Sequence, residues 1–297
     1  MNMIAPDPGK TDRPPHTPPP SPSIVISSSR GWRKMLRLAA TDIGEAMQLW
    51  PLIWTLSLFD IKLRYRGSIL GPFWLTLSTG VMIGTIGFLY SHLFHQQVSN
   101  YLPFLTISLI LWNFVSAITA EGAVCFTSSE GLIRGIRMPH SLHAARAVMR
   151  NILVLAHNLV VVVLVFFIFH IKPSLASFSL LPAFVLWVAD AFAICIFLGI
   201  LGARFRDIPP IIGSIMQIAF YLTPIMWNPN MLAHRGLSLA FVQLNPFFSL
   251  LEIVRGPLLG QALDPHAWLM ALGFSALLFI ITGALFTRAR PRIPYWI

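Results

Sequence analysis

Apolar runs alternate with short polar segments along most of the chain, and six of these runs approach the length of a membrane span. A helix needs roughly 20 apolar residues to cross the hydrocarbon core of a bilayer. The first run contains no charged residue, and the fourth is interrupted only by Asp190. The pattern predicts an all-α membrane protein with six transmembrane helices, at about residues 69–94, 101–122, 148–171, 176–203, 208–227 and 267–287.

The segment between the fifth and sixth runs, residues 228–266, is apolar but repeatedly broken by proline and glycine. Its uninterrupted pieces are too short to cross a bilayer. We therefore expect a pair of short re-entrant or interfacial helices before the last span. Such backbone is tolerated at membrane depth only where other parts of the protein cover it.

Residues 42–66, just before the first span, combine apolar positions at helical spacing with a basic end. Asp42 followed by Glu45 resembles a helix start, and Pro51 can open a second helix at its first position. The pattern predicts an amphipathic helix that lies in the headgroup layer. The same periodicity also fits a helix that packs in the cytoplasm.

Lysine and arginine collect on one side of the expected spans, and this bias sets the orientation. Of the 21 basic residues, only Lys172, Arg235 and Arg255 fall on the other side. Both termini are therefore expected in the cytoplasm. Residues 1–30 hold eight prolines and predict a disordered tail, residues 31–290 form the transmembrane domain, and residues 288–297 form a basic cytoplasmic C-terminus.

Composition supports a membrane protein and disfavours several other classes. Hydrophobic residues make up 56% of the chain and charged residues 11%, whereas soluble domains carry roughly a quarter charged residues. The net charge of +10 comes from basic residues beside apolar runs, so nucleic acid is not an expected partner. Two cysteines, Cys125 and Cys195, cannot make a disulfide framework or a four-ligand zinc site, and we interpret them as packing residues.

No motif in the sequence predicts a cofactor or a metal. The only fragment of a phosphate-binding loop, Gly9-Lys10-Thr11, lacks the loop's first glycine and a preceding strand. If transport is driven by ATP, another subunit must hydrolyse it. The pairs His92 with His95 and His140 with His143 have no nearby acidic or thiol ligand, which favours interfacial histidines over a metal site.

Two acidic residues lie in or beside the expected spans. A carboxylate at the bilayer centre costs roughly 2.5–3.5 kcal/mol on insertion scales. Asp190, near the middle of the fourth span, could serve a proton relay, but its isolation favours a group that packs helices or lines a cavity. Glu121 can reach the interface, and we expect it to be structural.

Aromatic residues make up 12% of the chain, with nine tryptophans. Such residues either form belts at the headgroup level or, as a set, line a route for sugars whose CH faces stack on rings. The sequence leaves both interpretations open for Trp74, Tyr90, Trp112, Trp187, Tyr221 and Trp227.

Four stretches carry a resemblance: DIKLRYRGSILGPFW (60–74), EGLIRGIRMP (130–139), ARFRDIPPIIGSIMQIAFYLTPIMW (203–227) and LNPFFSLLEIVRGPLLG (244–260). In this order and spacing they resemble type-2 ABC exporter permeases of the polysaccharide export group, which move O-antigen, teichoic acid or capsule chains. The similarity covers about residues 50–290. Departures include Met138-Pro139 in place of a common Phe-Pro, and Ser78-Thr79 where a proline is common.

The resemblance implies a non-enzymatic permease subunit in the bacterial inner membrane. Two copies would pair, dock two copies of a cognate ATP-binding subunit and export a lipid-linked polysaccharide. Residues implied to couple to the ATPase are Glu130, Leu132, Ile133, Arg134, Arg137, Met138 and Pro139.

The resemblance also implies a substrate entrance and an outer gate. The entrance set is Arg64, Tyr65, Arg66 and Trp74, and the gate set is Asn245, Pro246, Glu252 and Arg255. The guanidinium groups of Arg64 and Arg66 match the geometry of a carrier lipid's diphosphate, although they fit anchoring to anionic lipids equally well. Alternatives are export of another lipid or a drug, and proton-coupled transport through Asp190.

Overall fold

The computed structural model describes residues 31–71, 73–93, 96–172, 174–229 and 240–297. Throughout these ranges the regular elements are helices, and no strand occurs in them. The all-α prediction is confirmed for this part of the chain. The expected tail of residues 1–30, the fragment Gly9-Lys10-Thr11, His95 and Arg235 lie outside the described residues.

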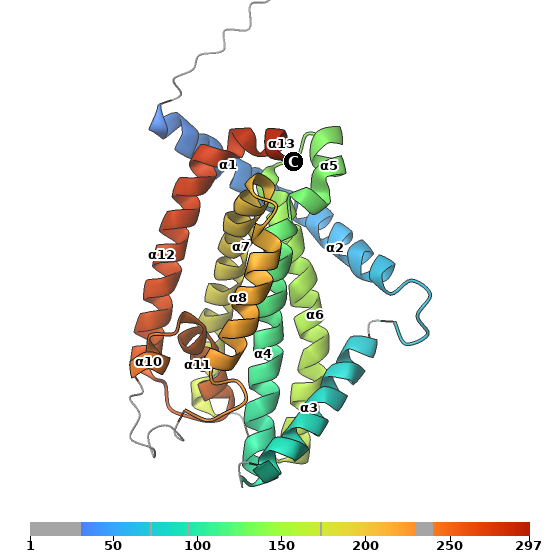
Figure 1. The fold of residues 1–297 in the computed structure, drawn as a ribbon, viewed down its shortest axis with the longest axis vertical. Helices are drawn as coiled ribbons and strands as arrows, with labels where there is room; N and C mark the ends of the chain where they lie inside the picture. The colour runs from blue at the N-terminus through green and yellow to red at the C-terminus, as the bar shows by residue number, and fades with distance from the viewer. Residues whose placement is uncertain (1–30, 72, 94–95, 173, 230–239) are drawn as a thin grey trace, which may run out of the picture.

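Long helices form an upright bundle (Figure 1). Five of the described helices are long and apolar enough to cross a membrane: α3 (Phe73–Leu93), α4 (Val98–Val124), α6 (His140–Ile168), α7 (Leu180–Arg204) and α12 (Pro265–Ala289). The fifth expected span instead contains α8 (Ile208–Leu222), an apolar helix of 15 residues.

The end of α8 follows from Pro224. Proline has no backbone N–H to continue a helix, and its ring pushes the preceding residue out of the α region. Thr223 is accordingly extended, with φ −88° and ψ 135°. Hydropathy alone predicted one run over residues 208–227, because the apolar character continues past the proline.

Short helices gather at the two ends of the bundle (Figure 1). At the upper end in this view lie α1 (Trp32–Gln48), α5 (Glu130–Gly135) and α13 (Ile293–Trp296), and α2 (Trp50–Arg64) slopes down from this end. α10 (Ala240–Gln243) and α11 (Pro246–Leu258) lie toward the other end. Single 3₁₀ turns cover Thr127–Ser129, Leu175–Ser179 and Arg290–Arg292.

The amphipathic segment before the first span is two helices, and the predicted helix start at Asp42 was wrong. α1 begins at Trp32, so Asp42 lies inside it. The Asp42 carboxylate instead accepts hydrogen bonds from the backbone N–H groups of His140 (3.2 Å) and Ser141 (3.0 Å), in the first turn of α6. Its capping chemistry serves a helix far away in the sequence. Pro51 does lie in the first turn of α2, but as its second residue and not at the predicted first position.

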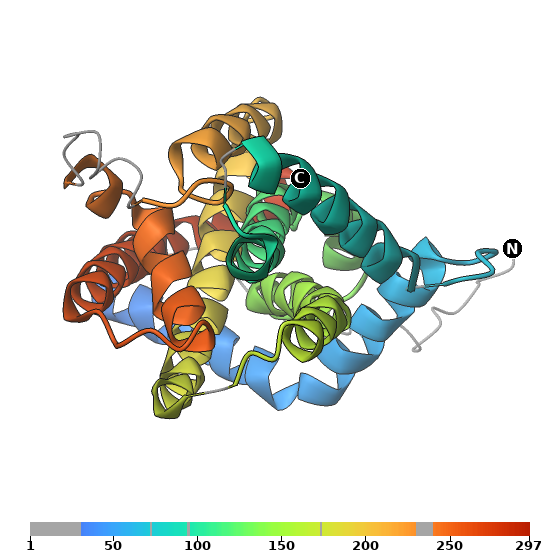
Figure 2. The same ribbon diagram turned by 90° about the horizontal axis from the view of Figure 1, so that it is seen from below.

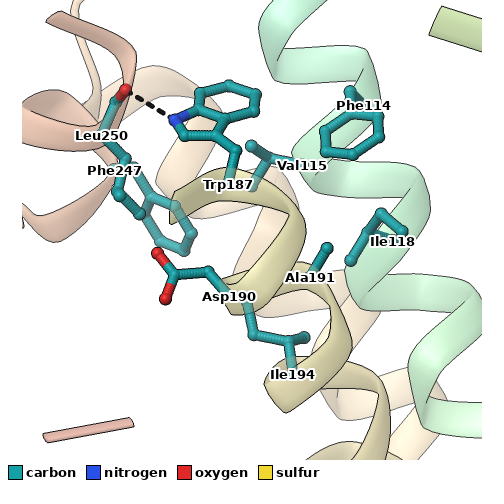
Figure 3. Close-up of a pocket in the computed structure, with 9 residues that line it drawn as sticks. All are labelled: Phe114, Val115, Ile118, Trp187, Asp190, Ala191, Ile194, Phe247 and Leu250. Atoms are coloured by element: carbon teal, nitrogen blue, oxygen red, sulfur yellow. Dashed lines mark hydrogen bonds between the residues drawn. The ribbon is translucent and has the colours of Figure 1, made fainter. Parts of the chain in front are cut away.

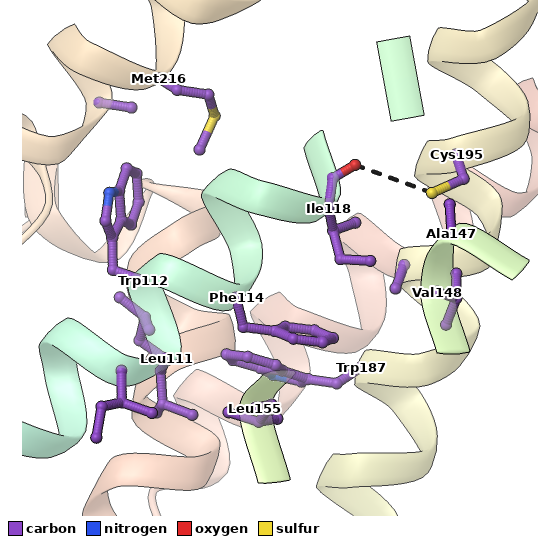
Figure 4. Packing of buried hydrophobic residues seen from close by; sticks show 14 of the residues in the cluster. Leu111, Trp112, Phe114, Ile118, Ala147, Val148, Leu155, Trp187, Cys195 and Met216 are labelled. Carbon is purple, nitrogen blue, oxygen red and sulfur yellow. Dashed lines mark hydrogen bonds between the residues drawn. The ribbon is translucent and has the colours of Figure 1, made fainter. Parts of the chain in front are cut away.

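The core centres on α4, the most buried of the five long helices, which packs against α3, α6, α7 and α8. Figure 2 shows it between these neighbours when the bundle is viewed end-on. Phe114 of α4 stacks on Trp187 of α7, with ring centroids 5.7 Å apart (Figure 4). Trp112 packs edge-on against Phe247 at 5.5 Å. Because Trp112 and Trp187 are buried, they belong to the core and not to a headgroup belt.

Backbone contact between α4 and α7 is closest at Gly202. A Cβ atom added there would lie 1.8 Å from the carbonyl oxygen of Ala123. Nearby, a Cβ on Gly122 would lie 3.1 Å from Cα of Cys195. Small residues allow such close approach between helices in membranes. Cys125 and Cys195 are both buried free thiols at this contact.

Gly202→Ala is expected to lower the free energy of unfolding by about 1–3 kcal/mol, because the methyl group must push α7 away from the α4 backbone. Thermal unfolding of the purified chain in detergent measures the loss. Gly283→Ala on α12 is the matched control, since its Cβ meets nothing within 4 Å. Equal stability of the two variants would contradict the close contact.

Candidate functional site

Polar side chains from α2, α4 and α6 form one network near the end of the bundle that holds α5. We call it the inner cluster, and it consists of Asp60, Arg64, Glu121, Arg146, Arg150 and Asn151. Asp60 on α2 accepts hydrogen bonds from Arg146 (Nε, 2.8 Å) and Arg150 (2.6 Å) on α6. Arg150 also donates to Glu121 on α4 at 2.6 Å. The inner cluster therefore ties three helices together.

Helical spacing brings the two central arginines of the inner cluster to one face. Arg146 and Arg150 are four residues apart on α6, so both guanidinium groups lie over the same stripe and reach Asp60. Burial raises the pKa of Asp60, but the hydrogen bonds and positive charges of Arg146 and Arg150 outweigh it and hold this pKa below its usual value. Asp60 is therefore ionised across the physiological pH range.

A cavity of about 340 Å³ adjoins the inner cluster. Its lining adds Ser128, Ser129 and His143 to the charged groups. Both ring nitrogens of His143 are buried without a hydrogen-bond partner among the described residues. A cavity with this many donors and acceptors suits water or a polar group.

The predicted entrance residues are only partly brought together. Arg64 joins the inner cluster through Glu121 at 3.1 Å, while its side chain stays 50% exposed. Arg66 lies exposed in the turn after α2, and Tyr65 is the residue that ends this helix. Trp74 is exposed in the first turn of α3. Sequence reasoning treated Glu121 as structural but missed its arginine partners, which lie on other helices.

A second ionic contact fixes the N-terminal helix α1. Asp42 accepts a hydrogen bond from Arg290 at 2.7 Å and another from the Ser141 hydroxyl at 2.6 Å. Burial raises the pKa of Asp42, but these bonds and the Arg290 charge hold it below its usual value. The contact joins α1, the start of α6 and the turn after α12.

The predicted coupling residues occupy α5 and the turn that follows it. One part is anchored: Ile133 packs on the main core, Met138 packs near Leu142, and Pro139 is buried at the start of α6. The other part is exposed and charged. Glu130 and Arg134 pair at 3.1 Å.

The remaining residues of this segment differ in their contacts and exposure. Arg134 also donates to the carbonyl oxygen of Ile297, which places the last helix beside α5 (Figure 1). Leu132 is half-buried, and Arg137 is exposed. Because its inner side is packed, α5 presents charged side chains from a fixed position.

Arg255 on α11 is the most deeply buried cation among the described residues, at 2% exposure. It donates to Glu252 (3.1 Å), to Ser108 Oγ (3.0 Å) and to the carbonyl oxygen of Pro224 (2.7 Å). Its guanidinium carbon lies 4.4 Å from the centre of the Phe104 ring. Arg255 therefore joins α11 to α4 and to the segment after α8.

The other two predicted gate residues begin α11. Asn245 caps this helix by accepting a hydrogen bond from the backbone N–H of Phe247 at 3.0 Å, and it donates to Thr223 at 2.9 Å. Pro246 stands in the first turn, where its missing N–H costs nothing. Sequence reasoning placed these residues together but missed their partners Ser108, Phe104 and Pro224. An arginine within an apolar stretch was the signal that such partners exist.

Comparison with known proteins decides the family. Residues 51–259, from α2 to the residue that follows α11, match the family described as ABC-2 type transporter. The chain belongs to this family. As an ABC-2 type transporter it is a multi-pass protein of the inner membrane and the transmembrane subunit of an ABC exporter. Family membership also implies a partner subunit that binds ATP.

Relatives of this ABC-2 type transporter include three proteins named O-antigen export system permease protein RfbA. One from Klebsiella pneumoniae is 22% identical over 236 residues, which cover 79% of this chain and 90% of the relative. Another from the same organism is 23% identical over 63% of this chain and 73% of its own length. One from Myxococcus xanthus is 23% identical over 80% of this chain and 90% of its own length.

Proposed function

We propose that this chain forms, with a second copy of itself, the channel of an exporter that moves a lipid-linked polysaccharide across the inner membrane. Two copies of a cognate ATP-binding subunit supply the energy, and the chain itself hydrolyses nothing. The observation that carries the proposal is the match to permeases named for O-antigen export, which extends over about four-fifths of this chain and 90% of two of the relatives.

In this proposal α8 and the bends after it make the fifth of six spans, and both termini are cytoplasmic. An α8 of 15 residues is only about 22 Å long, short of the roughly 30 Å hydrocarbon core. The residues after it can complete the crossing because their carbonyl groups are paired. Tyr101 donates to Met226 O at 2.6 Å and Arg255 to Pro224 O at 2.7 Å, which is the satisfaction that non-helical backbone needs at membrane depth.

α11 then lies at the outer mouth as the re-entrant or interfacial helix of the gate. Asn245 and Pro246 fix where it starts, while Glu252 and Arg255 fix what it packs against. The entrance lies at the opposite end, beside the inner cluster. There Arg66 is exposed and Arg64 is shared with Glu121, so Arg66 is the guanidinium better placed for a lipid diphosphate or an anionic lipid headgroup.

α5 is proposed as the coupling helix that seats on the ATP-binding subunit. The packed residues, Ile133 of α5 and Met138 of the turn after it, transmit displacement to α6, and the exposed residues Arg134 and Arg137 contact the partner. Substitutions of the exposed arginines therefore test the proposed function.

Charge reversal at Arg134 and Arg137 is expected to lower the amount of ATP-binding subunit that co-purifies by about tenfold, corresponding to ~1.4 kcal/mol of binding free energy. Surface polysaccharide should fall, and the lipid-linked intermediate should accumulate inside the cell. The measurement uses co-expression with the cognate ATP-binding subunit and matched membrane levels of each variant.

The control variant is Lys172→Glu, an exposed charge reversal after α6, at the opposite end of that helix from α5. It should leave complex formation and export unchanged. Normal association of the Arg134 and Arg137 variant would place the contact elsewhere. If the wild-type chain associates with the ATP-binding subunit, but a strain that lacks the chain still has a wild-type glycan surface, the cargo is another lipid or a drug.

A further inference from the structure

Asp190 is a buried carboxylate that neither the inner cluster nor the Arg255 network uses. It lies on α7 and is 4% exposed. Its Oδ2 accepts a hydrogen bond from Ser275 Oγ of α12 at 2.7 Å. Its Oδ1 is buried without a hydrogen-bond partner among the described residues. Figure 3 shows the carboxylate directed away from α4, toward the side of Phe247.

Two cavities meet at this carboxylate. The smaller, about 40 Å³, lies between α4, α7 and α11, and the larger, about 260 Å³, lies between α7, α11 and α12. Apart from Asp190 and Ser275, the larger cavity is walled by apolar side chains. They include Ile194, Phe197, Phe247, Leu250, Phe274 and Leu278.

The chemistry of these walls narrows the class of ligand. A carboxylate held among apolar groups is stabilised by a cation or a strong hydrogen-bond donor. No lysine, arginine or histidine lines either cavity. The apolar walls offer nothing to the many hydroxyl groups of a sugar, so this is not part of the proposed cargo route. They do suit a compact hydrocarbon body.

We propose that the larger cavity binds a small amphiphile with one protonated amine and a compact apolar body. The ammonium group donates to Oδ1 of Asp190, while Ser275 keeps Oδ2, and the hydrocarbon lies between Phe247, Phe274 and Leu278. The binding itself does not depend on the cargo proposed above.

The same ligand would hold α11 in place. Leu250 and Phe247 belong to α11, and Trp187 Nε1 donates to Leu250 O at 3.0 Å beside the smaller cavity. A ligand wedged between α7 and α12 therefore contacts the helix that carries Arg255. On the proposed function, an occupied cavity would resist any movement of the outer gate and slow export.

Adamantylamine, a rigid hydrocarbon cage with one ammonium group, is the probe for this site. Binding is followed by the tryptophan fluorescence of the purified chain in lipid nanodiscs, since the indole of Trp187 donates to the carbonyl oxygen of Leu250, a residue that lines the larger cavity. We expect saturable binding that is weakened about tenfold or more by Asp190→Asn. Adamantanol, which has the same cage without the charge, should bind the wild-type chain about tenfold more weakly than the amine.

A second variant tests the cavity while it preserves the carboxylate. Leu278→Trp fills the space and should abolish binding of the amine, and it keeps the test decisive if Asp190→Asn does not fold. Asp207→Asn, an exposed acid outside both cavities, should bind as the wild type does. Equal binding of amine and alcohol, or unchanged binding by both cavity variants, would overturn the proposal and leave a cavity that holds only lipid chains.

Discussion

Replacing Arg255 with methionine is expected to lower the free energy of unfolding by about 3–5 kcal/mol. The substitution leaves the Glu252 carboxylate without its cationic partner, and it removes the N–H groups that donate to Ser108 Oγ and to the carbonyl oxygen of Pro224. Methionine fills much of the arginine's volume, so the loss reports the polar contacts and not a cavity. Thermal unfolding of the purified chain in detergent gives the measurement.

Two companion variants separate the causes of this loss. Arg206→Met removes an exposed cation and should change stability by less than about 0.5 kcal/mol. Adding Glu252→Met to Arg255→Met should recover part of the loss, because it removes the carboxylate that the first substitution left unpaired. An unchanged unfolding temperature for Arg255→Met would mean that Arg255 contributes no net stability.

Removing both carboxylates of the inner cluster, with Asp60→Asn and Glu121→Gln, is expected to cost about 3 kcal/mol. Arg146 and Arg150 would then face each other and Arg64 without an acidic partner from the cluster. Because Asp60 holds the C-terminal end of α2 to α6, this end of the helix should also loosen, while Ser57, which donates to the Arg146 carbonyl oxygen, and the packed Ile53 hold the rest of α2 in place. Limited proteolysis near Arg64, together with thermal unfolding, reports both effects.

The pH dependence of this contact has a definite sign. The pKa of Asp60 is lowered in the folded chain from the ordinary value of 3.8. Its contribution to stability is therefore fully present above pH 3.8 and is lost as the pH falls through the lower, folded value. The double variant should lose this part of the acid sensitivity. The control is Glu45→Gln with Asp207→Asn, two exposed acids; an equal loss of stability in that control would contradict the role of the inner cluster.

Hydrophobic patterning predicted the helical membrane class, and the order of four stretches predicted the family. Both signals depend only on neighbouring residues or on the order of segments along the chain. The interactions that fix the helices are not. Asp42 carried a correct capping chemistry, but its partner helix begins at His140, and only the fold brings the two together. The same is true of Asp60 with Arg150 and of Arg255 with Ser108.

The burial of individual side chains within the bundle could not be predicted from the sequence either. Trp112 and Trp187 looked like belt residues because periodicity cannot separate a lipid-facing side from a protein-facing side in an entirely apolar helix. The end of α8, in contrast, could be predicted from the sequence. Pro224 disfavours a helical conformation at Thr223, but the hydropathy averaged over residues 208–227 does not show this break. The effect of Pro224 on the backbone of the preceding residue predicts that this helix ends at Leu222.

The backbone contact at Gly202 limits where the protein can move. Side chains that meet through flexible tips can slide past one another, but α4 and α7 touch through Ala123 O and a residue without a side chain, reinforced by the stacked rings of Phe114 and Trp187. Sliding of α7 along α4 at this contact would force atoms to overlap, so we expect the two helices to move as one rigid body. Motion during transport is then expected around these two helices: in α6 and α11, which the proposed coupling and gate residues adjoin, and in α3 and α8, whose outward apolar residues such as Val81 and Ile218 can exchange one soft neighbour for another.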